Sequence, residues 1–320
     1  MRHTYRNKDY MKKLLFVFNP HAGKGRITTK LVRIIQVLSS GDYIVTAYPT
    51  KERRDAYEYV LKHEQEYDTI VCSGGDGTLN EVVGAVLKNG RGTPVGYIPG
   101  GTMNDWAANT GIPTDMVKAA EVIVQGKPVP FDICRFNGKG NFNYVAAFGA
   151  FTDIAYATPQ SLKKIIGQTA YGVTAIKSLT QLRPYDLKVE YDGGKVLEGK
   201  YLFGMACNSK FVGGFKLTGM HTDLHDGKFS LALIKEIRNP LDITGLFGAD
   251  IAQDYMDKDN IDIVETSKAR FIFDEPVKWT LDGEYGGCLK ESEVEIVHNG
   301  INFIIRDEEP VVEYKKGQKK

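Results

Sequence analysis

The chain has 320 residues, enough for two domains, and its 42% apolar and 25% charged residues are ordinary for a soluble globular protein. Its 41 basic and 40 acidic side chains give a net charge of +1, which argues against a nucleic-acid binder. Four widely spaced cysteines form no CxxC pair, which argues against a zinc knuckle or a disulfide framework and favours a reducing cytoplasm.

The first half of the chain alternates between short β-rich runs and amphipathic segments. After a leader over residues 1–10 that we expect to be disordered, the pattern predicts strands over 13–20, 43–50, 69–72 and 94–100, followed by helices over 28–40, 52–65, 79–88 and from about Asp105. Alternation with short connections predicts right-handed βαβ units and a parallel sheet. Such sheets bind ligands at the carboxyl ends of their strands, and glycine loops follow three of these ends.

From about residue 129 the chain changes to runs typical of antiparallel strands, divided by Gly, Asn and Asp turns. The exception is the segment 159–184, whose apolar residues have helical spacing between two prolines; we interpret it as an inserted helix or helix pair. No stretch reaches the roughly 18 consecutive apolar residues of a membrane span. The expected fold class is therefore α/β followed by a mostly β half.

The loop SGGDGT (73–78) stands between a predicted strand and a predicted helix. Its backbone N–H groups and the positive end of the helix dipole would bind an anion. Asp76 in this loop suits a Mg²⁺ ion bound to phosphates, either as a direct ligand of the ion or as a residue that contacts its ligands. The alternative from the residues alone is a glycine turn with an N-cap aspartate.

Two further glycine loops follow neighbouring strands. IPGGTMND (98–105) offers Thr102, Asn104 and Asp105 at a helix start, and Asp76 with Asp105 would suit a divalent cation that prefers oxygen ligands. Independent capping of two helices is the alternative. NPHAGKG (19–25) supplies backbone N–H groups and the cation of Lys24, although its spacing is not that of the GxxxxGK[ST] phosphate loop.

In this order along the chain, NPHAGKG, SGGDGTLNEVV and PGGTMNDWA resemble the diacylglycerol kinase catalytic domain shared by bacterial lipid kinases and sphingosine kinases. The resemblance implies an N-terminal α/β ATP-binding domain with a parallel sheet over residues 12–130, to which residues from about 300–320 return. It implies a C-terminal antiparallel, β-sandwich-like lipid-substrate domain over residues 131–299, with the active site in the cleft between the domains.

The resemblance also implies roles for individual residues. In KWTLDGE (278–284), Glu284 is the expected general base, and Asp282 supports it or coordinates Mg²⁺; the alternative is a hairpin turn, because Asp-Gly is a common turn pair. Asp76 and Asp105 are expected to organise the catalytic metal. The expected contacts to ATP are Asn19, Pro20, His21, Ala22, Gly23, Lys24, Thr50, Gly74, Gly75, Asp76, Gly77, Thr78, Leu79, Asn80, Thr102 and Asn104.

The segment HTDLHDGKFSL (221–231) holds two histidines four residues apart, a spacing that binds zinc on a helix. Asp226-Gly227 and the alternating run after it favour a turn into a strand instead. By resemblance, Asp223, Asp226 and the backbone carbonyl of Lys228 form a structural Mg²⁺ site, which leaves His221 and His225 as solvated loop residues.

The expected activity is that of an ATP- and Mg²⁺-dependent lipid kinase, with diacylglycerol as the default acceptor and phosphatidic acid as the product. Two alternatives stay open: a phosphotransferase resembling NAD kinases, which share the GGDGT loop, and a nucleotide-binding regulatory module without catalysis. We expect a cytoplasmic protein in peripheral contact with the inner face of the membrane. Lys163, Lys164 and the four tail lysines Lys315, Lys316, Lys319 and Lys320 would add about 1 kcal/mol of attraction to anionic lipids per lysine. The alternative is that these lysines are solvated and only keep the protein soluble. Edge strands in either domain could pair two chains into a homodimer.

Overall fold

The computed structural model describes residues 11–149, 183–209, 211–212, 215–216, 223–235 and 261–306. The chain divides into two compact units, the first formed by residues 1–131 and 300–320 and the second by residues 132–299. It passes between them twice, within strands β5 (Lys127–Phe136) and β15 (Glu284–Ile305). Residues 159–182 of the predicted helical insertion, with its lysines, His221 and the basic tail lie outside the described residues.

The sheet of the first unit consists of β1 (Lys12–Phe18), β2 (Tyr43–Pro49), β3 (Thr69–Gly74), β4 (Val95–Pro99) and the end of β15. Its order is β2-β1-β3-β4-β15, and each neighbouring pair runs parallel. β3 and β4 are buried along their whole length, as expected for strands with both faces covered.

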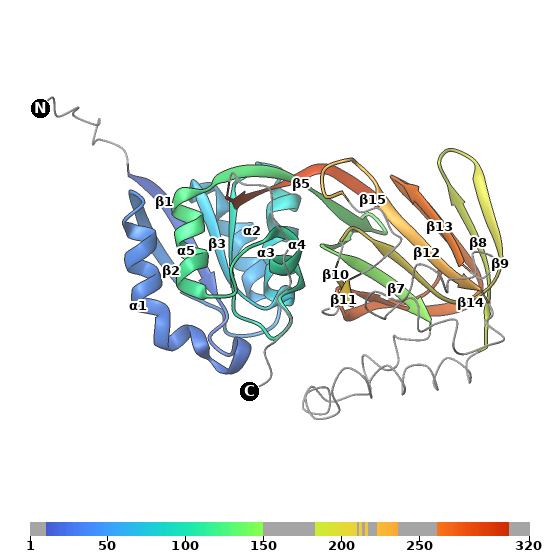
Figure 1. The fold of residues 1–320 in the computed structure, drawn as a ribbon, viewed down its shortest axis with the longest axis horizontal. Coiled ribbons are helices and arrows are strands. Elements are labelled where there is room, and N and C mark those ends of the chain that lie inside the picture. The colour runs from blue at the N-terminus through green and yellow to red at the C-terminus, as the bar shows by residue number, and fades with distance from the viewer. Residues whose placement is uncertain are drawn as a thin grey trace, which may run out of the picture. The chain divides into compact units, whose positions relative to one another are not determined.

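Helices α1 (Arg26–Ser39), α2 (Asp55–His63), α3 (Asp76–Asn89), α4 (Asp105–Thr110) and α5 (Met116–Gln125), with short 3₁₀ turns η1 (Ala22–Lys24) and η2 (Glu64–Glu66), complete the first unit. α1 packs against α5 and α2 against α3, and Figure 1 shows these pairs on opposite sides of the strands. Amphipathic spacing explains the packing of α1, which buries Ile27, Ile34 and Leu38. α5 begins where the Asp115 carboxylate accepts from Val117 N at 3.0 Å.

The second unit is antiparallel. Its strands are β6 (Gly140–Phe142), β7 (Val145–Gly149), β8 (Tyr185–Tyr191), β9 (Lys195–Cys207), β12 (Phe229–Lys235), β13 (Ile261–Thr266) and β14 (Lys268–Leu281), with parts of β5 and β15 and the short pair β10 (Phe211–Val212) and β11 (Phe215–Lys216). β7 and β8 each pair with both β9 and β14, so these four strands close on themselves. In its pairing with β15, β14 has a register irregularity between Ile272 and Val277. Before this irregularity β14 pairs with β8, and after it β14 pairs with β7.

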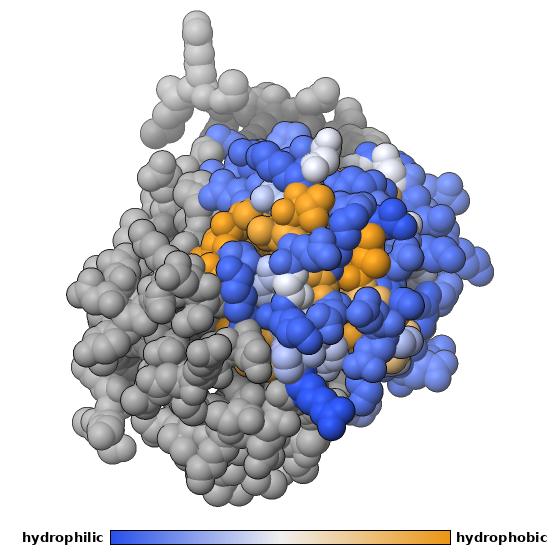
Figure 2. Space-filling model, turned by 90° about the vertical axis from the view of Figure 1, so that its right-hand side faces the viewer, coloured by the Kyte–Doolittle hydropathy of each residue, from blue (hydrophilic) through white to orange (hydrophobic). Residues whose placement is uncertain are grey.

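Aromatic side chains fill the core of the second unit. The Trp279 ring lies 5.0 Å from the rings of Phe148 and Phe271, centroid to centroid. On the surface, Arg270 pairs with Glu291 at 2.7 Å and Lys268 with Glu293 at 3.0 Å. Figure 2 shows one face of this unit, on which charged and polar side chains surround a group of apolar ones. Among the helices that the structure describes, none is long and apolar enough to cross a bilayer.

Candidate active site

Three glycine loops meet at one edge of the first unit, because β1, β3 and β4 are parallel and each ends in such a loop. The loop after β3 passes through Gly75 into α3, and the loop after β4 passes through Gly101 into α4. The N–H groups of Gly100 and Gly101 both donate to Gly74 O, at 2.7 and 3.1 Å. The second and third loops therefore form one hydrogen-bonded structure.

Glycine is required where these two loops touch. A Cβ atom on Gly101 would lie 2.5 Å from Gly75 Cα, and a Cβ atom on Gly74 would lie 2.6 Å from the Thr78 side chain. Real Cβ atoms essentially never approach other atoms so closely. Gly101 thus allows close approach of its backbone to that of Gly75 in the other loop, and Gly74 leaves room for the Thr78 side chain of its own loop.

The loop after β1 is tied to the other two. Gly23, Lys24 and Gly25 follow one another in left-handed conformation, with φ of 54°, 68° and 71°. A Cβ atom on Gly23 would collide with Gly100 O. Arg26 Nη2 donates to Gly101 O at 3.2 Å. The loop therefore presents the exposed Lys24 and the Arg26 guanidinium beside the other two glycine loops.

Asp76 is the first residue of α3, and its carboxylate reaches the start of α4. Its Oδ1 accepts from Trp106 N at 3.3 Å, and the N–H groups of Asn104 and Asp105 also point to it. Burial raises the pKa of Asp76 above its ordinary value, although these hydrogen bonds act in the opposite direction. Asp76 therefore accepts from the first turn of α4 and is at the same time a carboxylate whose ionised form is only partly compensated by hydrogen bonds. A divalent cation would supply that compensation, so the site fits Mg²⁺ with oxygen ligands.

Asn104 shapes the third loop with its side chain. It has a left-handed φ of 55°. Its Oδ1 accepts from Gly101 N at 2.8 Å, and its Nδ2 donates to Gly101 O at 3.1 Å. Tyr97, in the middle of β4, donates from its hydroxyl to Gly74 O at 3.1 Å and was not among the predicted site residues. These side chains hold the glycine backbone in position.

The remaining residues predicted to contact ATP lie in the first unit, at the strand ends or on α3. Thr50 follows β2 and is buried, with its N–H donating to Phe18 O. Asn19 Oδ1 accepts from the N–H of the exposed His21. Leu79 is completely buried, so its side chain belongs to the core. The rest of the set, Pro20, Ala22, Gly77, Thr78, Asn80 and Thr102, lies partly or fully exposed on the same loops and the first turns of α3.

The hairpin with Asp282 and Glu284 belongs to the second unit. The Asp282 carboxylate accepts three main-chain hydrogen bonds, from Asn143 N at 2.7 Å and from Tyr144 N and Val145 N at 3.0 Å each. Asp282 N donates to Val145 O at 2.8 Å, and Asp282 itself has a left-handed φ of 49°. Asp282 therefore fixes the turn to the segment before β7, while Glu284 is exposed at the start of β15.

The loop before β12 contains the predicted structural metal site. Asp223 Oδ1 accepts from His225 N at 3.0 Å, and Asp226 Oδ1 accepts from Lys228 N at 2.9 Å. Each carboxylate thus folds its own loop with one oxygen. Within the described ranges, no three His, Cys, Asp or Glu side chains gather as a metal-binding group. The set of two carboxylates and one carbonyl stays a prediction.

Asp132 is a buried carboxylate beside the predicted metal loop that sequence reasoning did not single out. It is fully buried on β5 and accepts from Gly227 N at 2.7 Å, Asn299 N at 2.7 Å and His298 Nδ1 at 2.8 Å. Its carboxylate therefore ties the loop that contains Asp226 to β5 and to His298 and Asn299 of β15. The available signal was an aspartate inside the apolar run VPFDICRF, because a carboxylate in a buried strand needs several partners.

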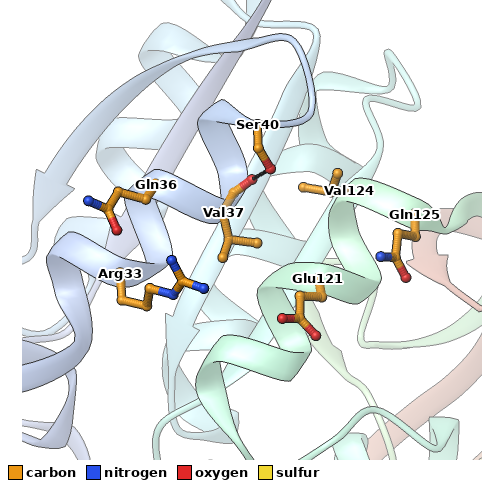
Figure 3. A pocket seen from close by; sticks show the side chains of 7 residues that line it. All are labelled: Arg33, Gln36, Val37, Ser40, Glu121, Val124 and Gln125. Carbon is orange, nitrogen blue, oxygen red and sulfur yellow. Dashed lines mark hydrogen bonds between the residues drawn. The ribbon is translucent and has the colours of Figure 1, made fainter.

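A separate groove lies between the second halves of α1 and α5. Figure 3 shows the residues that line it: Arg33, Gln36 and Val37 from α1, Glu121, Val124 and Gln125 from α5, and Ser40 directly after α1. The glycine loops adjoin the first turn of α1, at the other end of the helix, so the groove is distinct from the candidate site.

The sequence and the fold were compared with known proteins. Residues 13–136 match the family described as diacylglycerol kinase catalytic domain. A diacylglycerol kinase of Bacillus subtilis is 31% identical over 281 residues, which cover 87% of this chain and 92% of the relative. The chain belongs to the diacylglycerol kinase family. A diacylglycerol kinase of Staphylococcus carnosus is 29% identical, over 87% of this chain and 90% of the relative.

Solved structures share the fold. A crystal structure of a diacylglycerol kinase from Bacillus anthracis has a TM-score of 0.78 and 24% identity, and the match covers 92% of this chain and 98% of that one. Membership of the diacylglycerol kinase family confirms the resemblance drawn from the three glycine motifs and supports a kinase that acts on a lipid.

Proposed function

We propose that the protein is an ATP- and Mg²⁺-dependent kinase that phosphorylates diacylglycerol to phosphatidic acid, and so acts in phospholipid metabolism. The observation that carries the proposal is the set of three interlocked glycine loops around the partly buried Asp76 carboxylate. Phosphoryl transfer depends on positioning and charge neutralisation, and these loops supply both through N–H groups, cations and carboxylates.

The phosphates of ATP would lie against the N-terminal turn of α3, where N–H groups have no helical acceptor and the dipole favours negative charge. Lys24 and Arg26 add positive charge from the loop after β1. Asp76 and Asp105 would hold Mg²⁺, which neutralises charge on the transferred phosphate. The hydrogen bonds among the loops fix these groups before ATP arrives, and this limits the reorganisation that binding requires.

Glu284 would accept the proton of the lipid hydroxyl. The hydroxyl oxygen then bonds to the γ-phosphorus while the bond from that phosphorus to the β–γ bridging oxygen breaks, which gives phosphatidic acid and ADP. Asp282 takes no part in the proton transfer in this scheme, because its carboxylate is occupied by three main-chain N–H groups. Its role is to hold the turn that carries Glu284.

The substrate places the reaction at a membrane surface, and we propose a cytoplasmic enzyme in peripheral contact with the inner leaflet. Co-sedimentation with vesicles that contain diacylglycerol and an anionic phospholipid tests this location. Binding that rises with the anionic fraction and falls with salt is expected. Equal, negligible binding to all vesicles would contradict it.

The proposed reaction is tested by transfer of labelled γ-phosphate from ATP to diacylglycerol, sphingosine and undecaprenol in mixed micelles, with NAD in a parallel reaction. We expect label on diacylglycerol that requires Mg²⁺ and falls at least a hundredfold in Glu284→Gln. The matched control is Glu275→Gln, an exposed carboxylate on β14 of the same unit, which should keep full activity. Label on NAD alone, or equal activity in both variants, would contradict the proposal.

A further inference from the structure

The loop from Thr50 to Arg54 lies at the same edge of the first unit as the glycine loops. It follows β2, which runs parallel to β1, and Thr50 N donates to Phe18 O at the end of β1 at 2.9 Å. Neighbouring strands lie about 4.8 Å apart, so β2 ends about 10 Å from the end of β3, across β1. A nucleotide whose phosphates lie at the start of α3 would therefore meet this loop with its nucleoside part.

The loop ends at Arg54, which is the N-cap of α2 and makes no capping hydrogen bond with its own side chain. Arg54 has a left-handed φ of 69°. Its guanidinium lies 4.9 Å from the centre of the Tyr57 ring and pairs with Glu58 at 3.4 Å. Because the first N–H groups of a helix have no acceptor within the helix, the start of α2 requires an acceptor from elsewhere.

Glu81 of α3 supplies that acceptor. Its Oε1 accepts from Arg54 N at 2.8 Å, and the N–H groups of Ala56 and Tyr57 also point to its carboxylate. Burial raises the pKa of the half-buried Glu81, whereas these hydrogen bonds and the charge of Arg54 act in the opposite direction. Glu81 is therefore a cap of α2 that a neighbouring helix provides, and α2 and α3 pack against each other (Figure 1).

A second carboxylate, that of Asp55, fixes the shape of the loop from within. It accepts from the Tyr48 hydroxyl at 2.9 Å and from Lys51 N at 2.7 Å, and these residues belong to β2, the loop and α2. Glu81, in contrast, belongs to α3 and follows Asp76 by five residues, about 7.5 Å along the helix axis. Asp55 thus determines the shape of the loop, and Glu81 determines where the loop lies relative to the first turn of α3.

We propose that Glu81 is a positioning residue for ATP, which keeps the loop that begins at Thr50 in the place where the nucleoside part of the nucleotide binds. The proposal rests on the proposed function only in requiring that ATP binds at the glycine loops, and it does not depend on which lipid is phosphorylated. Without the Glu81 carboxylate the loop leaves this place for part of the time, and the apparent affinity for ATP falls in proportion. The groups proposed to hold the phosphates lie elsewhere, on the glycine loops and in the first turn of α3.

Calorimetry with two ligands separates this role from a general loss of structure. ATP and inorganic triphosphate, each with Mg²⁺, both offer three phosphates, but triphosphate lacks the nucleoside. We expect Glu81→Ala to weaken ATP binding about tenfold, as for a loop in place about a tenth of the time, and to change triphosphate binding less than about twofold. Glu81→Gln keeps one acceptor oxygen and should weaken ATP binding only about threefold. The matched control is Glu58→Gln, an exposed residue that pairs with the Arg54 side chain, which should bind both ligands as the wild type does.

Steady-state kinetics give a second readout. Glu81→Ala should raise KM for ATP about tenfold and leave kcat within about twofold, because no group at the transferred phosphate has changed. Equal losses of affinity for ATP and triphosphate, no loss for either, or a fall in kcat at unchanged KM would overturn the positioning role while ATP binding by the wild type stands. A wild type that binds neither ligand would overturn the proposed function together with this role. If Glu81→Ala does not fold, the same comparison of ligands with Glu81→Gln decides.

Discussion

Replacing Asp282 with alanine tests whether this residue anchors the turn before Glu284. The substitution leaves three buried main-chain N–H groups, those of Asn143, Tyr144 and Val145, without the acceptor they have at 2.7 to 3.0 Å. A hydrogen bond to a charged group contributes about 1.5–3 kcal/mol, and an unpaired buried group costs about 1–3 kcal/mol. Because such terms are not additive, we expect a loss of about 4 kcal/mol in the free energy of unfolding, as for other buried charged networks.

Urea unfolding with tryptophan fluorescence measures this loss. Trp279 lies in the core of the second unit, on the strand that leads to Asp282, so the Trp106→Phe background reports on that unit. The control is Asp186→Ala, an exposed carboxylate of the same unit with an ion pair to Lys200 at 3.3 Å, for which we expect less than about 0.5 kcal/mol. A loss below about 1 kcal/mol for Asp282→Ala, or equal losses in both variants, would refute the anchoring role.

Two further substitutions probe the glycine loops, and a third probes the contact between α3 and the start of α2. Asp76→Asn should abolish phosphate transfer yet stabilise the ATP-free protein at pH 7, because burial raises the pKa of Asp76. The gain in stability should vanish below the ordinary pKa of 3.8, where the carboxyl is protonated in both the folded and unfolded states. Thermal unfolding across pH measures this gain. Gly23→Ala forces a left-handed alanine against Gly100 O and should weaken ATP binding about tenfold or more by calorimetry. Glu81→Ala removes the acceptor of Arg54 N at 2.8 Å, before α2, and should cost about 1 kcal/mol in urea unfolding, whereas Glu81→Gln should cost less.

The strands and helices of the first unit follow from local sequence. The run predicted as a strand over 43–50 is β2 at Tyr43–Pro49, and the helix predicted over 28–40 is α1 at Arg26–Ser39. The helix predicted from residue 79 begins earlier, at Asp76, because Gly75 supplies the extended residue before it and Asp76 and Gly77 already belong to the first turn. Apolar periodicity marks the buried part of a helix and does not mark such a polar first turn.

The roles of the acidic residues could not be predicted to the same depth, since they depend on contacts between distant parts of the chain. Asp282 and Asn143 are 139 positions apart, and Asp132 and His298 are 166 apart. A turn motif predicts that Asp282 precedes a hairpin, but not which N–H groups its carboxylate accepts from. For Asp76, the sequence offered an N-cap of its own helix and a metal ligand as alternatives. In the structure the N-cap of α3 is Gly75, with no side-chain hydrogen bond, and the largely buried Asp76 carboxylate accepts from Trp106 N in the first turn of α4.

The position of β15 in the chain has a consequence for biosynthesis. The strand that completes the first unit beside β4 arrives after the entire second unit has been made, with Phe303 pairing opposite Val95. Its ring then packs against Trp106 at 4.7 Å and Phe131 at 5.7 Å between ring centroids. During translation β4 of the N-terminal sheet therefore lacks this neighbour until the chain has been synthesised beyond residue 303. Ribosome-bound chains that end before residue 300 should be more sensitive to protease and depend more on chaperones than the released protein.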